Sequence, residues 1–384
     1  MESAGSPFER VTLDQLRTRT SAKWREFPSD VLPLWVAEMD TIVAEPITEA
    51  VHRTLTAGDT GYPHGSGYAE AMAAFARQRW AWEIDTRLVR PVTDVMNGLV
   101  ETLRLVTGPG DAVVVTPPVY PPFFTFLGHH DLRLVMAPLG LDGRLDLGSL
   151  EQAFRTATAA GGRAAVVLAN PHNPTGVVHT ATELASVAAL AEQFGVRVVV
   201  DEIHAPLTHP GFEFTPYLSV PGGDRGFSVI SASKGWNLAA FKSALVIAGA
   251  GSADDLARMP IEVSYGASAI GVLAHTVALT EAVDWLDDHR RALDANRQFL
   301  AEQLAVRLPG VGYQVPEATF LAWLDCRRLR LGDDPAALFL ERGRVALNPG
   351  QSFGPGGAGH VRLNFATSRA ILTEAVDRMA AVLP

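Results

Sequence analysis

Six short runs of apolar, mostly branched residues in the middle of the chain constrain the fold more than any other feature. None of them alternates apolar with polar residues, which is typical of strands buried on both faces of a parallel sheet. Helical patterns over residues 147–159 and 181–194 lie between them. This strand–helix alternation predicts an α/β layered domain. The runs are 112–116, 132–137, 164–168, 197–201, 227–231 and 244–248.

The C-terminal part of the chain has a different pattern. Residues 281–306 have apolar positions at helical spacing with charges between them, which predicts a long amphipathic helix. Shorter strand candidates follow at 319–323, 345–347 and 361–365. A chain of 384 residues exceeds the size at which one core usually stops growing. We therefore expect a large domain over 47–280 and a smaller α+β domain made of 1–46 and 281–384.

Composition excludes several classes of protein. A net charge of −10 argues against a nucleic-acid partner or an anionic membrane surface. Cys326 is the only cysteine, so neither an internal disulfide nor a multi-cysteine metal site can form. The polar N-terminal sequence lacks the apolar stretch of a secretory signal, and no run approaches the roughly 18 apolar residues of a membrane span. We expect a soluble, cytoplasmic protein with no membrane or nucleic-acid partner.

Lysine is rare in this chain. Only Lys23, Lys234 and Lys242 occur, and the other 29 of the 32 cationic side chains are arginine. An amine can lose its proton and form an imine, whereas a guanidinium cannot. Each lysine is therefore a candidate for chemistry that arginine cannot perform. Coding bias explains an arginine-rich composition equally well, so the neighbouring residues must decide.

Lys234 and Asp201 each follow or end one of the apolar runs. Ligands of open parallel sheets gather outside such strand ends. A carboxylate there can cap a helix, bind Mg²⁺ or pair with a protonated heterocycle. The nucleotide-hydrolase version of a magnesium site needs G-x-x-x-x-G-K-[ST], and the chain contains no Gly-Lys pair. Asp201 with an imine-forming lysine fits pyridoxal 5′-phosphate (PLP), whose pyridine nitrogen must stay protonated to withdraw electrons.

A PLP site also needs a phosphate cradle. Residues 97–103 (NGLVETL) read as a glycine turn that opens a helix, whose first N–H groups favour an anion. A second turn, 170–176 (NPHNPTG), follows the run 164–168 and can aim amides at a ligand. Each signal is weak alone, since such sequences are often only turns. The predicted phosphate-side residues are Gly98, Leu99, Val100, Ser231, Ser233 and Lys242.

Three segments in this order, NPHNPTG, VVVDEIH and SASKGWNLAAFK, resemble the fold-type I PLP enzymes of the aminotransferase class I/II family. The resemblance runs from about residue 30 to the end. It implies the PLP-dependent transferase fold, with a mostly parallel central sheet in the large domain and a smaller α+β domain. It also implies an amino-acid substrate and a homodimer with active sites at the subunit interface.

The resemblance implies a role for each matching residue. Lys234 would form the imine with PLP, Asp201 would face the pyridine nitrogen, and Asn173 would donate to the phenolic oxygen. His204 stands where many relatives have a tyrosine that touches the same oxygen. Lys242 stands where the common signature has an arginine to the phosphate, which keeps the charge but loses bidentate geometry.

Further residues match the family by position. Tyr120 corresponds to the aromatic residue that stacks on the cofactor ring, and Tyr62 to a tyrosine that reaches a phosphate in the neighbouring subunit. Arg362 corresponds to the arginine that binds the substrate α-carboxylate. The full set predicted to bind substrate is Arg362, Asn170, Trp35 and Ala37.

Two other patterns are decoys. Residues 354–359 (GPGGAG) satisfy the dinucleotide fingerprint G-x-G-x-x-G, but they precede a strand candidate instead of opening a helix, so we interpret them as a turn. His204 and His209 could share a metal with Asp201, but the eleven histidines show no established ligand spacing. We expect no metal.

The N-terminal segments LPLWVAEMD (32–40) and TGYP (60–63), with DEIH and PGF (210–212), resemble the MalY/PatB-type carbon–sulfur β-lyases. These act as cystathionine β-lyases or cysteine-S-conjugate lyases. The subfamily more often has Asp-Met-Asp, so Glu38 is a departure near the expected entrance of the site. The implied reaction cleaves cystathionine or a related conjugate to a thiol, pyruvate and ammonia.

Two alternatives remain open. In the implied mechanism the freed Lys234 amine removes the Cα proton, and a thiolate on the β-carbon then leaves. Without a leaving group, reprotonation at C4′ of the cofactor leads to transamination. An aminotransferase would use the same residues, so the motifs do not distinguish the two activities. A fold-retaining regulator with weak activity is the second alternative. Direct DNA binding is disfavoured because only about thirty residues precede the family match.

Overall fold

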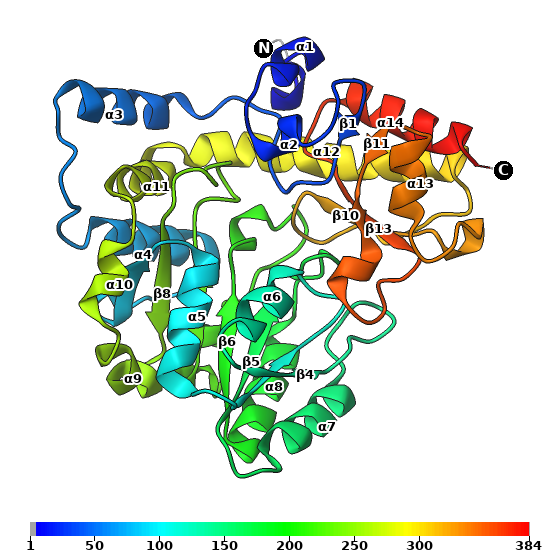
Figure 1. The fold of residues 1–384 in the computed structure, drawn as a ribbon. Helices are drawn as coiled ribbons and strands as arrows, with labels where there is room; N and C mark the ends of the chain where they lie inside the picture. The colour runs from blue at the N-terminus through cyan, green and yellow to red at the C-terminus, as the bar shows by residue number, and fades with distance from the viewer. Residues whose placement is uncertain (1–4, 384) are drawn as a thin grey trace.

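Seven strands form the central sheet of the computed structural model, which describes residues 5–383 (Figure 1). Their order is β2-β8-β7-β6-β5-β3-β4. The five strands from β7 to β4 pair in parallel, whereas β8 is antiparallel to both β7 and β2. The strands are β2 (Val89–Val92), β3 (Ala112–Val115), β4 (Arg133–Met136), β5 (Ala164–Ala169), β6 (Val196–Asp201), β7 (Phe227–Ile230) and β8 (Ala244–Ala248).

The predicted α/β domain with a mostly parallel sheet is confirmed. All six predicted runs are strands, and their ends agree to within one residue. Residues 113 and 114 show why these strands do not alternate in polarity. Val113 packs with the helix that follows β2, α5 (Val95–Val106), whereas Val114 packs on the opposite face with α7 (Leu147–Thr158) and α8 (Ala181–Phe194). Both faces are therefore apolar.

The edges of the sheet differ from the prediction. Strand β2 was not predicted, because Val-Arg-Pro-Val is too short and too polar to resemble the other strands. At the opposite edge β4 has exposed residues at both ends, Arg133 and Met136, so it is not buried on both faces. The short helix α6 (Pro122–Gly128) lies near α5 in front of the sheet in Figure 1.

A second, four-stranded antiparallel sheet forms the C-terminal part, in the order β12-β13-β10-β9. It follows the long helix α12 (Val283–Arg307), which the pattern over 281–306 predicted. The remaining elements of this part are β9 (Gly312–Tyr313), β10 (Leu321–Asp325), α13 (Pro335–Glu341), β12 (Asn348–Pro349), β13 (His360–Asn364) and α14 (Arg369–Ala381).

The N-terminal segment packs with this C-terminal part. Strand β1 (Leu32–Pro33) pairs in parallel with β11 (Val345–Ala346). The strand candidate at 345–347 therefore pairs with the chain's beginning and does not belong to the four-stranded sheet. The sequence could not reveal this partner, because the two strands lie more than 300 residues apart. The domain boundaries, 47–280 for the large domain and 1–46 with 281–384 for the small one, remain a prediction.

The other helices frame these sheets. In Figure 1, α3 lies apart from the central sheet, beside α11. The sequence 354–359 forms a turn before β13, as predicted for the dinucleotide decoy. These helices are α1 (Leu13–Arg17), α2 (Ala22–Arg25), α3 (Glu45–Thr56), α4 (Gly67–Trp80), α9 (Ala253–Ala257), α10 (Ile261–Tyr265) and α11 (Ala269–Glu281).

Short 3₁₀ turns complete the chain: Pro7–Glu9, Thr86–Leu88, Ala205–Leu207, Tyr217–Ser219, Gly223–Arg225, Ala250–Ser252, Arg327–Leu329 and Gly350–Phe353. Between residues 5 and 383, no single helix is both long and apolar enough to cross a membrane. Helices α11 and α12, bent by 77° at their junction, pass that test only as a pair, by length and composition.

Candidate active site

A cavity of about 270 Å³ opens beyond the carboxyl ends of the central strands. Strands β5, β6 and β7 end at or just before its wall, where parallel sheets usually bind ligands. Eight residues predicted from the sequence lie in its lining: Ala37, Tyr120, Asn173, Asp201, His204, Ser233, Lys234 and Lys242. The remaining lining residues are Asp94, Val95, Met96, Pro122, Phe126, Ala169, Ile203, Ala239, Phe241 and Ser243.

Lys234 presents a weakly basic amine to this cavity. The turn after β7 carries it, and its Nζ donates a 2.7 Å hydrogen bond to the carbonyl oxygen of Ala37. Burial and, to a smaller extent, the nearby Arg362 charge lower the pKa of Lys234 to about 8. About half of the amine is therefore neutral at pH 8, and about a tenth at pH 7. A neutral amine can attack a carbonyl carbon or accept a proton.

Asp201 ends β6 and faces the same cavity. Its Oδ1 accepts a 3.0 Å hydrogen bond from the backbone N–H of Ile203, and no side chain in residues 5–383 forms an ion pair with it. Burial raises the pKa of Asp201 to about 7, although the Lys234 charge opposes this. A buried carboxylate without a cationic partner is costly. A protonated pyridine nitrogen would supply that partner, so the residue fits PLP.

The neighbouring Glu202 faces away from the cavity. Its Oε1 accepts a 2.8 Å hydrogen bond from the N–H of Tyr217, and its Oε2 accepts one from the Ser228 hydroxyl. Burial raises its pKa to about 7. Consecutive residues at a strand end point to opposite sides, so Asp201 faces the ligand cavity and Glu202 supports the loop behind it.

Arg362, on β13, brings a buried cation to the side of the cavity where Asn173 lies. Its Nη1 donates to Asn173 Oδ1 at 3.0 Å and its Nη2 donates to the Trp35 carbonyl oxygen at 3.1 Å. The guanidinium also lies 5.1 Å from the centre of the Phe353 ring. Among the described residues Nε has no partner and no carboxylate pairs with this arginine. Because burial lowers its pKa only to about 10, it stays charged and can receive a carboxylate.

Tyr120 and His204 supply the aromatic walls. Burial raises the pKa of Tyr120, whose ring meets Phe123 edge to face. Burial, with the nearby Lys234 and Arg362 charges, lowers the pKa of His204 to about 3. The imidazole is therefore neutral, and its Nδ1 is without a partner in the described part of the chain. It is available as a hydrogen-bond donor or acceptor to a bound ring.

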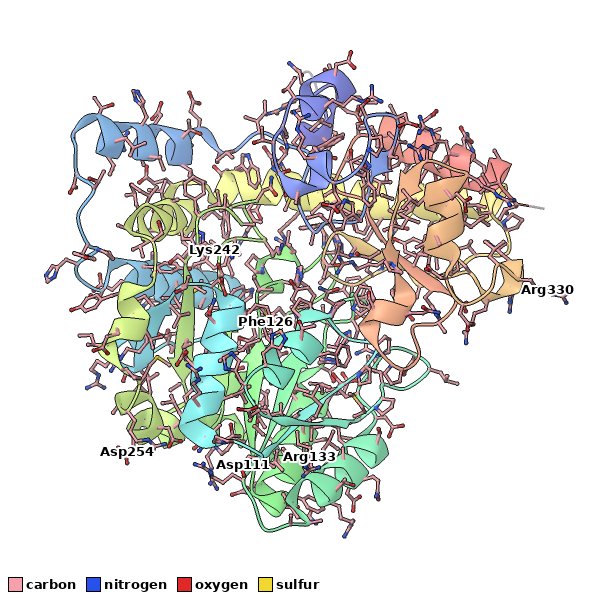
Figure 2. All side chains as sticks on the ribbon, in the orientation of Figure 1. Asp111, Phe126, Arg133, Lys242, Asp254 and Arg330 are labelled. Carbon is pink, nitrogen blue, oxygen red and sulfur yellow. The ribbon has the colours of Figure 1, made fainter. Side chains whose placement is uncertain are left out.

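The helix predicted to open within 97–103 begins earlier in the structure. Helix α5 begins at Val95, and the Asp94 side chain caps it by accepting from the N–H of Asn97. Its first amides, Val95 and Met96, lack partners within the helix and line the cavity. Lys242, labelled in Figure 2, lies 3.0 Å from Asp94.

Gly98, Leu99 and Val100 lie inside that helix and not at its opening. Gly98 faces the sheet: a Cβ there would lie 2.8 Å from Val229 and 3.0 Å from Val92. The glycine is needed for close packing of helix on sheet, and Leu99 and Val100 are buried. These residues therefore support the helix and do not contact the cavity.

The hydroxyl residues form a chain behind the lysine. Ser231 donates to the Ser243 carbonyl oxygen at 2.7 Å and accepts from the backbone N–H of Ser233 at 3.1 Å. Ser233 and Ser243 line the cavity, whereas Ser231 supports them from beneath.

Besides Gly98, Leu99, Val100 and Ser231, four predicted residues are absent from the cavity lining: Arg362, which reaches it only through Asn173, and Asn170, Tyr62 and Trp35. Asn170 is buried; its Nδ2 donates to the Thr215 carbonyl oxygen and its Oδ1 accepts from the N–H of His179. It therefore fixes the 170–176 turn. Tyr62 is 86% exposed, and its ring lies beside that of Tyr265. Trp35 contributes its carbonyl group to Arg362 and not its ring to the cavity.

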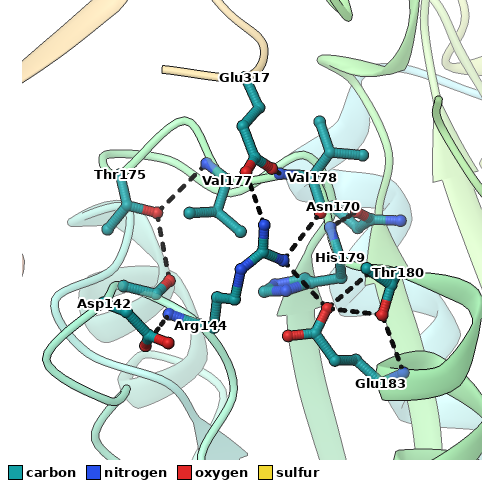
Figure 3. A network of polar contacts seen from close by, with 11 residues as sticks. Asp142, Arg144, Asn170, Thr175, Val177, Val178, His179, Thr180, Glu183 and Glu317 are labelled. Atoms are coloured by element: carbon teal, nitrogen blue, oxygen red, sulfur yellow. Dashed lines mark hydrogen bonds and ion pairs between the residues drawn. The ribbon is translucent and has the colours of Figure 1, made fainter. Parts of the chain in front are cut away.

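A polar network that the sequence did not indicate holds Val178, just after the 170–176 turn (Figure 3). Arg144 donates to the Val178 carbonyl oxygen at 3.2 Å, to Glu183 at 3.1 Å and to Glu317 at 2.5 Å. Glu317 also accepts from the N–H of Val178 at 2.7 Å. Glu317 precedes β10 of the small sheet, so this network joins the turn that carries Asn173 to the part that carries Arg362.

Comparison with known proteins agrees with this geometry. The family model for aminotransferase class I and II matches residues 32–379. A Mycobacterium leprae protein named "Putative cystathionine beta-lyase" is 52% identical over 395 residues, with 98% of each chain covered. The cystathionine beta-lyase of Corynebacterium glutamicum is 32% identical, with 97% of this chain and 99% of that protein covered. A solved structure from Corynebacterium diphtheriae, a "putative plp-dependent beta-cystathionase", has a TM-score of 0.92 and 33% identity over 99% of each chain.

Proposed function

This chain belongs to the aminotransferase class I and II family, and from that premise we propose that it is a PLP-dependent carbon–sulfur β-lyase. It cleaves cystathionine or a related cysteine S-conjugate to a thiol, pyruvate and ammonia. The family, the fold and the cofactor predicted from the motifs are confirmed. The lyase prediction agrees with the full-length relatives, which are named for that activity. The substrate is a small amino acid.

One observation carries the proposal. Lys234, a buried amine of lowered pKa, and Asp201, a buried carboxylate of raised pKa, line the same cavity. The cavity residues match the functional groups of PLP. Lys234 would hold its aldehyde carbon, Asp201 its pyridine nitrogen, and the start of α5 with Ser233 and Lys242 its phosphate. Asn173, His204 and Tyr120 would surround the ring.

PLP, when bound, withdraws electrons from the amino acid's Cα and so weakens the bonds to the Cα proton and, next, to the β-sulfur. The protein supplies the proton transfer and the orientation. The Lys234 amine, at a pKa of about 8, removes the Cα proton. Arg362 receives the α-carboxylate, which fixes the amino acid so that its Cα–H points toward Lys234. The ionised Asp201 carboxylate would keep the pyridine nitrogen of PLP protonated.

The carbon substituent on the sulfur would lie against an apolar part of the cavity wall. Phe126 on α6, labelled in Figure 2, Met96 and Phe241 provide apolar surface in the cavity lining. These side chains give no strong donor for a particular polar tail. We therefore infer that the pocket accepts several S-substituents on the cysteine moiety.

Product analysis tests the activity. The purified enzyme with PLP is incubated with cystathionine and with several S-substituted cysteines, and pyruvate and free thiol are measured. Equal amounts of both are expected. A parallel incubation with amino-acid donors and 2-oxoglutarate measures transamination. Glutamate formation without pyruvate or thiol would assign the chain to the aminotransferases instead.

We further propose that the enzyme is a homodimer in which Tyr62 reaches the partner's phosphate site. Tyr62 and Tyr265 are large, exposed and in mutual contact, with ring centres 6.2 Å apart. Ile261, on the same short helix as Tyr265, is also exposed. Exposed apolar residues grouped in this way favour a protein interface.

A further inference from the structure

Residues 35–39, which we term the strap, belong to no strand or helix, and Ala37 at their centre lines the cavity. An irregular segment has no ladder to satisfy its carbonyl groups, so side chains must do so. Here every one of its five carbonyl oxygens accepts from a side chain. The donors are Arg362 and Asn348 to Trp35, Asn364 to Val36 and Glu38, Lys234 to Ala37, Lys23 to Glu38, and Asn237 and Arg19 to Met39.

Two of these donors are the cations of the proposed reaction. Lys234 reaches the Ala37 carbonyl oxygen at 2.7 Å, and Arg362 reaches the Trp35 carbonyl oxygen at 3.1 Å. The position of the strap therefore decides where the free amine and the guanidinium lie. A displacement of about 1 Å is enough to cost a catalytic group much of its effect.

Lys23 fixes the end of the strap. Its side chain is 0% exposed, its ammonium lies 2.8 Å from Asp40 Oδ1, and it donates to the Glu38 carbonyl oxygen at 3.0 Å. Asp40 is buried as well, and its N–H donates to the Ala366 carbonyl oxygen. Trp24 donates to the same Oδ1 at 3.2 Å, while Oδ2 has no partner in residues 5–383.

A buried ion pair of this kind adds little net stability, because desolvation offsets the attraction between the charges. Its geometric effect is large, since neither charge can move without losing its partner. The ammonium is compact and its three donors can converge on Asp40 and Glu38 together, which the larger planar guanidinium cannot do in the same space. This explains a lysine in a chain whose cations are otherwise almost all arginine.

We propose that Lys23 is a positioning residue that, through Asp40 and Glu38, holds the strap where Ala37 orients the Lys234 amine and Trp35 orients Arg362. Lys23 does not line the cavity, so it acts through the strap and not on the substrate. The proposal rests on the proposed function for its kinetic consequence. Its structural consequence, a local loosening of the strap, does not.

The test compares Lys23→Met with the parent enzyme, both loaded with PLP. Amide exchange is followed by mass spectrometry in a peptide over residues 34–41, whose Met39 and Asp40 N–H groups are bonded in the parent. Exchange there is expected to rise at least tenfold, with peptides from β5 and β6 unchanged. The kcat for cystathionine should fall about tenfold or more and KM should rise, while PLP affinity changes less than threefold.

Arg25→Met is the matched control, because Arg25 is exposed on the same short helix and donates only to the Thr18 carbonyl oxygen. It should leave exchange and kinetics unchanged. Lys23→Arg keeps the charge and should not restore the parent values. If Lys23→Met does not fold, the same exchange and kinetic measurements are made on the double variant Lys23→Met/Asp40→Asn, which lacks both buried charges.

Unchanged exchange over 34–41 in the single or double variant would overturn the proposal. Loosening of equal size in the central sheet would do the same, since it would show a general structural role. A parent enzyme without lyase activity would contradict the proposed function but leave the exchange experiment intact.

Discussion

Arg362 on the small sheet donates a 3.0 Å hydrogen bond to the side-chain oxygen of Asn173 on the large-sheet side of the cavity. The residue expected to bind the substrate carboxylate thus touches the residue expected to bind the cofactor's phenolic oxygen. Substrate and cofactor sites are therefore coupled through one contact.

Arg362→Lys is expected to raise KM for the amino acid by about 10- to 100-fold, because an ammonium cannot make two parallel hydrogen bonds to a carboxylate. Asn173→Ala should weaken both PLP and amino-acid binding, since it removes a cofactor contact and frees Arg362. Steady-state kinetics and PLP titration measure both. Arg328→Lys, at an exposed position, is the control. An unchanged KM in Arg362→Lys would place the carboxylate elsewhere.

Lys234→Ala is expected to abolish both the visible absorbance of the bound cofactor and all turnover, because it removes the buried amine that would link to the cofactor and accept the Cα proton. Lys242→Ala should weaken PLP retention by only about fivefold, because this side chain is exposed and its ion pair with Asp94 is screened by water. Absorbance spectra and dialysis measure the two effects. Complete loss in both variants would contradict the assignment of the two lysines.

Asp201→Ala should keep the covalent link to Lys234 but slow Cα proton removal by at least about 100-fold, since nothing then holds the ring nitrogen protonated. Loss of the substrate's Cα deuterium measures that step. Glu202→Gln is the matched control: it changes the adjacent buried carboxyl, which bonds to Tyr217 and Ser228 outside the cavity. A near-normal rate in Asp201→Ala would refute the role of this carboxylate.

Much of the fold could be predicted from the sequence because strands buried on both faces are continuous runs of apolar residues. The error at 97–103 had a physical cause. Asn-Gly is a common turn, but here the Asp94 side chain caps the helix three residues earlier and Gly98 is needed for contact with Val229 and Val92. Glycine is favoured both in turns and where a helix packs closely on a sheet, so a single sequence does not show which of the two explains Gly98.

The contacts that orient the site were harder to predict. Arg144 and Glu317 are 173 positions apart, and the other arginines give no reason to single out this one. Lys23 was conspicuous by rarity, but no spacing rule connects it with Asp40 or with the strap. The motifs identify groups that carry chemistry, whereas the residues that hold those groups in place emerge only from the folded chain.

Acid should destabilise the cofactor-free protein strongly between pH 6.5 and 5. Burial lowers the pKa of His172, His179, His204 and His209 to about 3 and that of His275 and His289 to about 4. Below pH 6.5 the unfolded chain binds protons that the folded chain does not, so each histidine costs up to about 1.4 kcal/mol per pH unit.

Asp201 and Glu202 act in the opposite direction. Burial raises the pKa of both to about 7, so the folded chain binds their protons first and gains stability as pH falls from 7 to 4. Two carboxyls do not offset six imidazoles, so the melting temperature should fall. Thermal unfolding at pH 8, 6.5 and 5 measures this. His179→Leu removes a ring whose nitrogens have no partner in the described residues and should flatten the slope; a melting temperature that rises toward pH 5 would contradict the prediction.

Tyr62 provides the last prediction. If it completes the partner's phosphate site, Tyr62→Ala should raise the dissociation constant of PLP while the chain stays folded, because the side chain is 86% exposed in the single chain. Mixing Tyr62→Ala with Lys234→Ala then tests action across the interface. In a mixed dimer one site combines an intact Lys234 from one subunit with an intact Tyr62 from the other. Random exchange of subunits should restore about a quarter of the parent activity. Sedimentation of an active monomer, or a mixture no more active than the Tyr62→Ala protein alone, would show that Tyr62 does not act across a dimer interface.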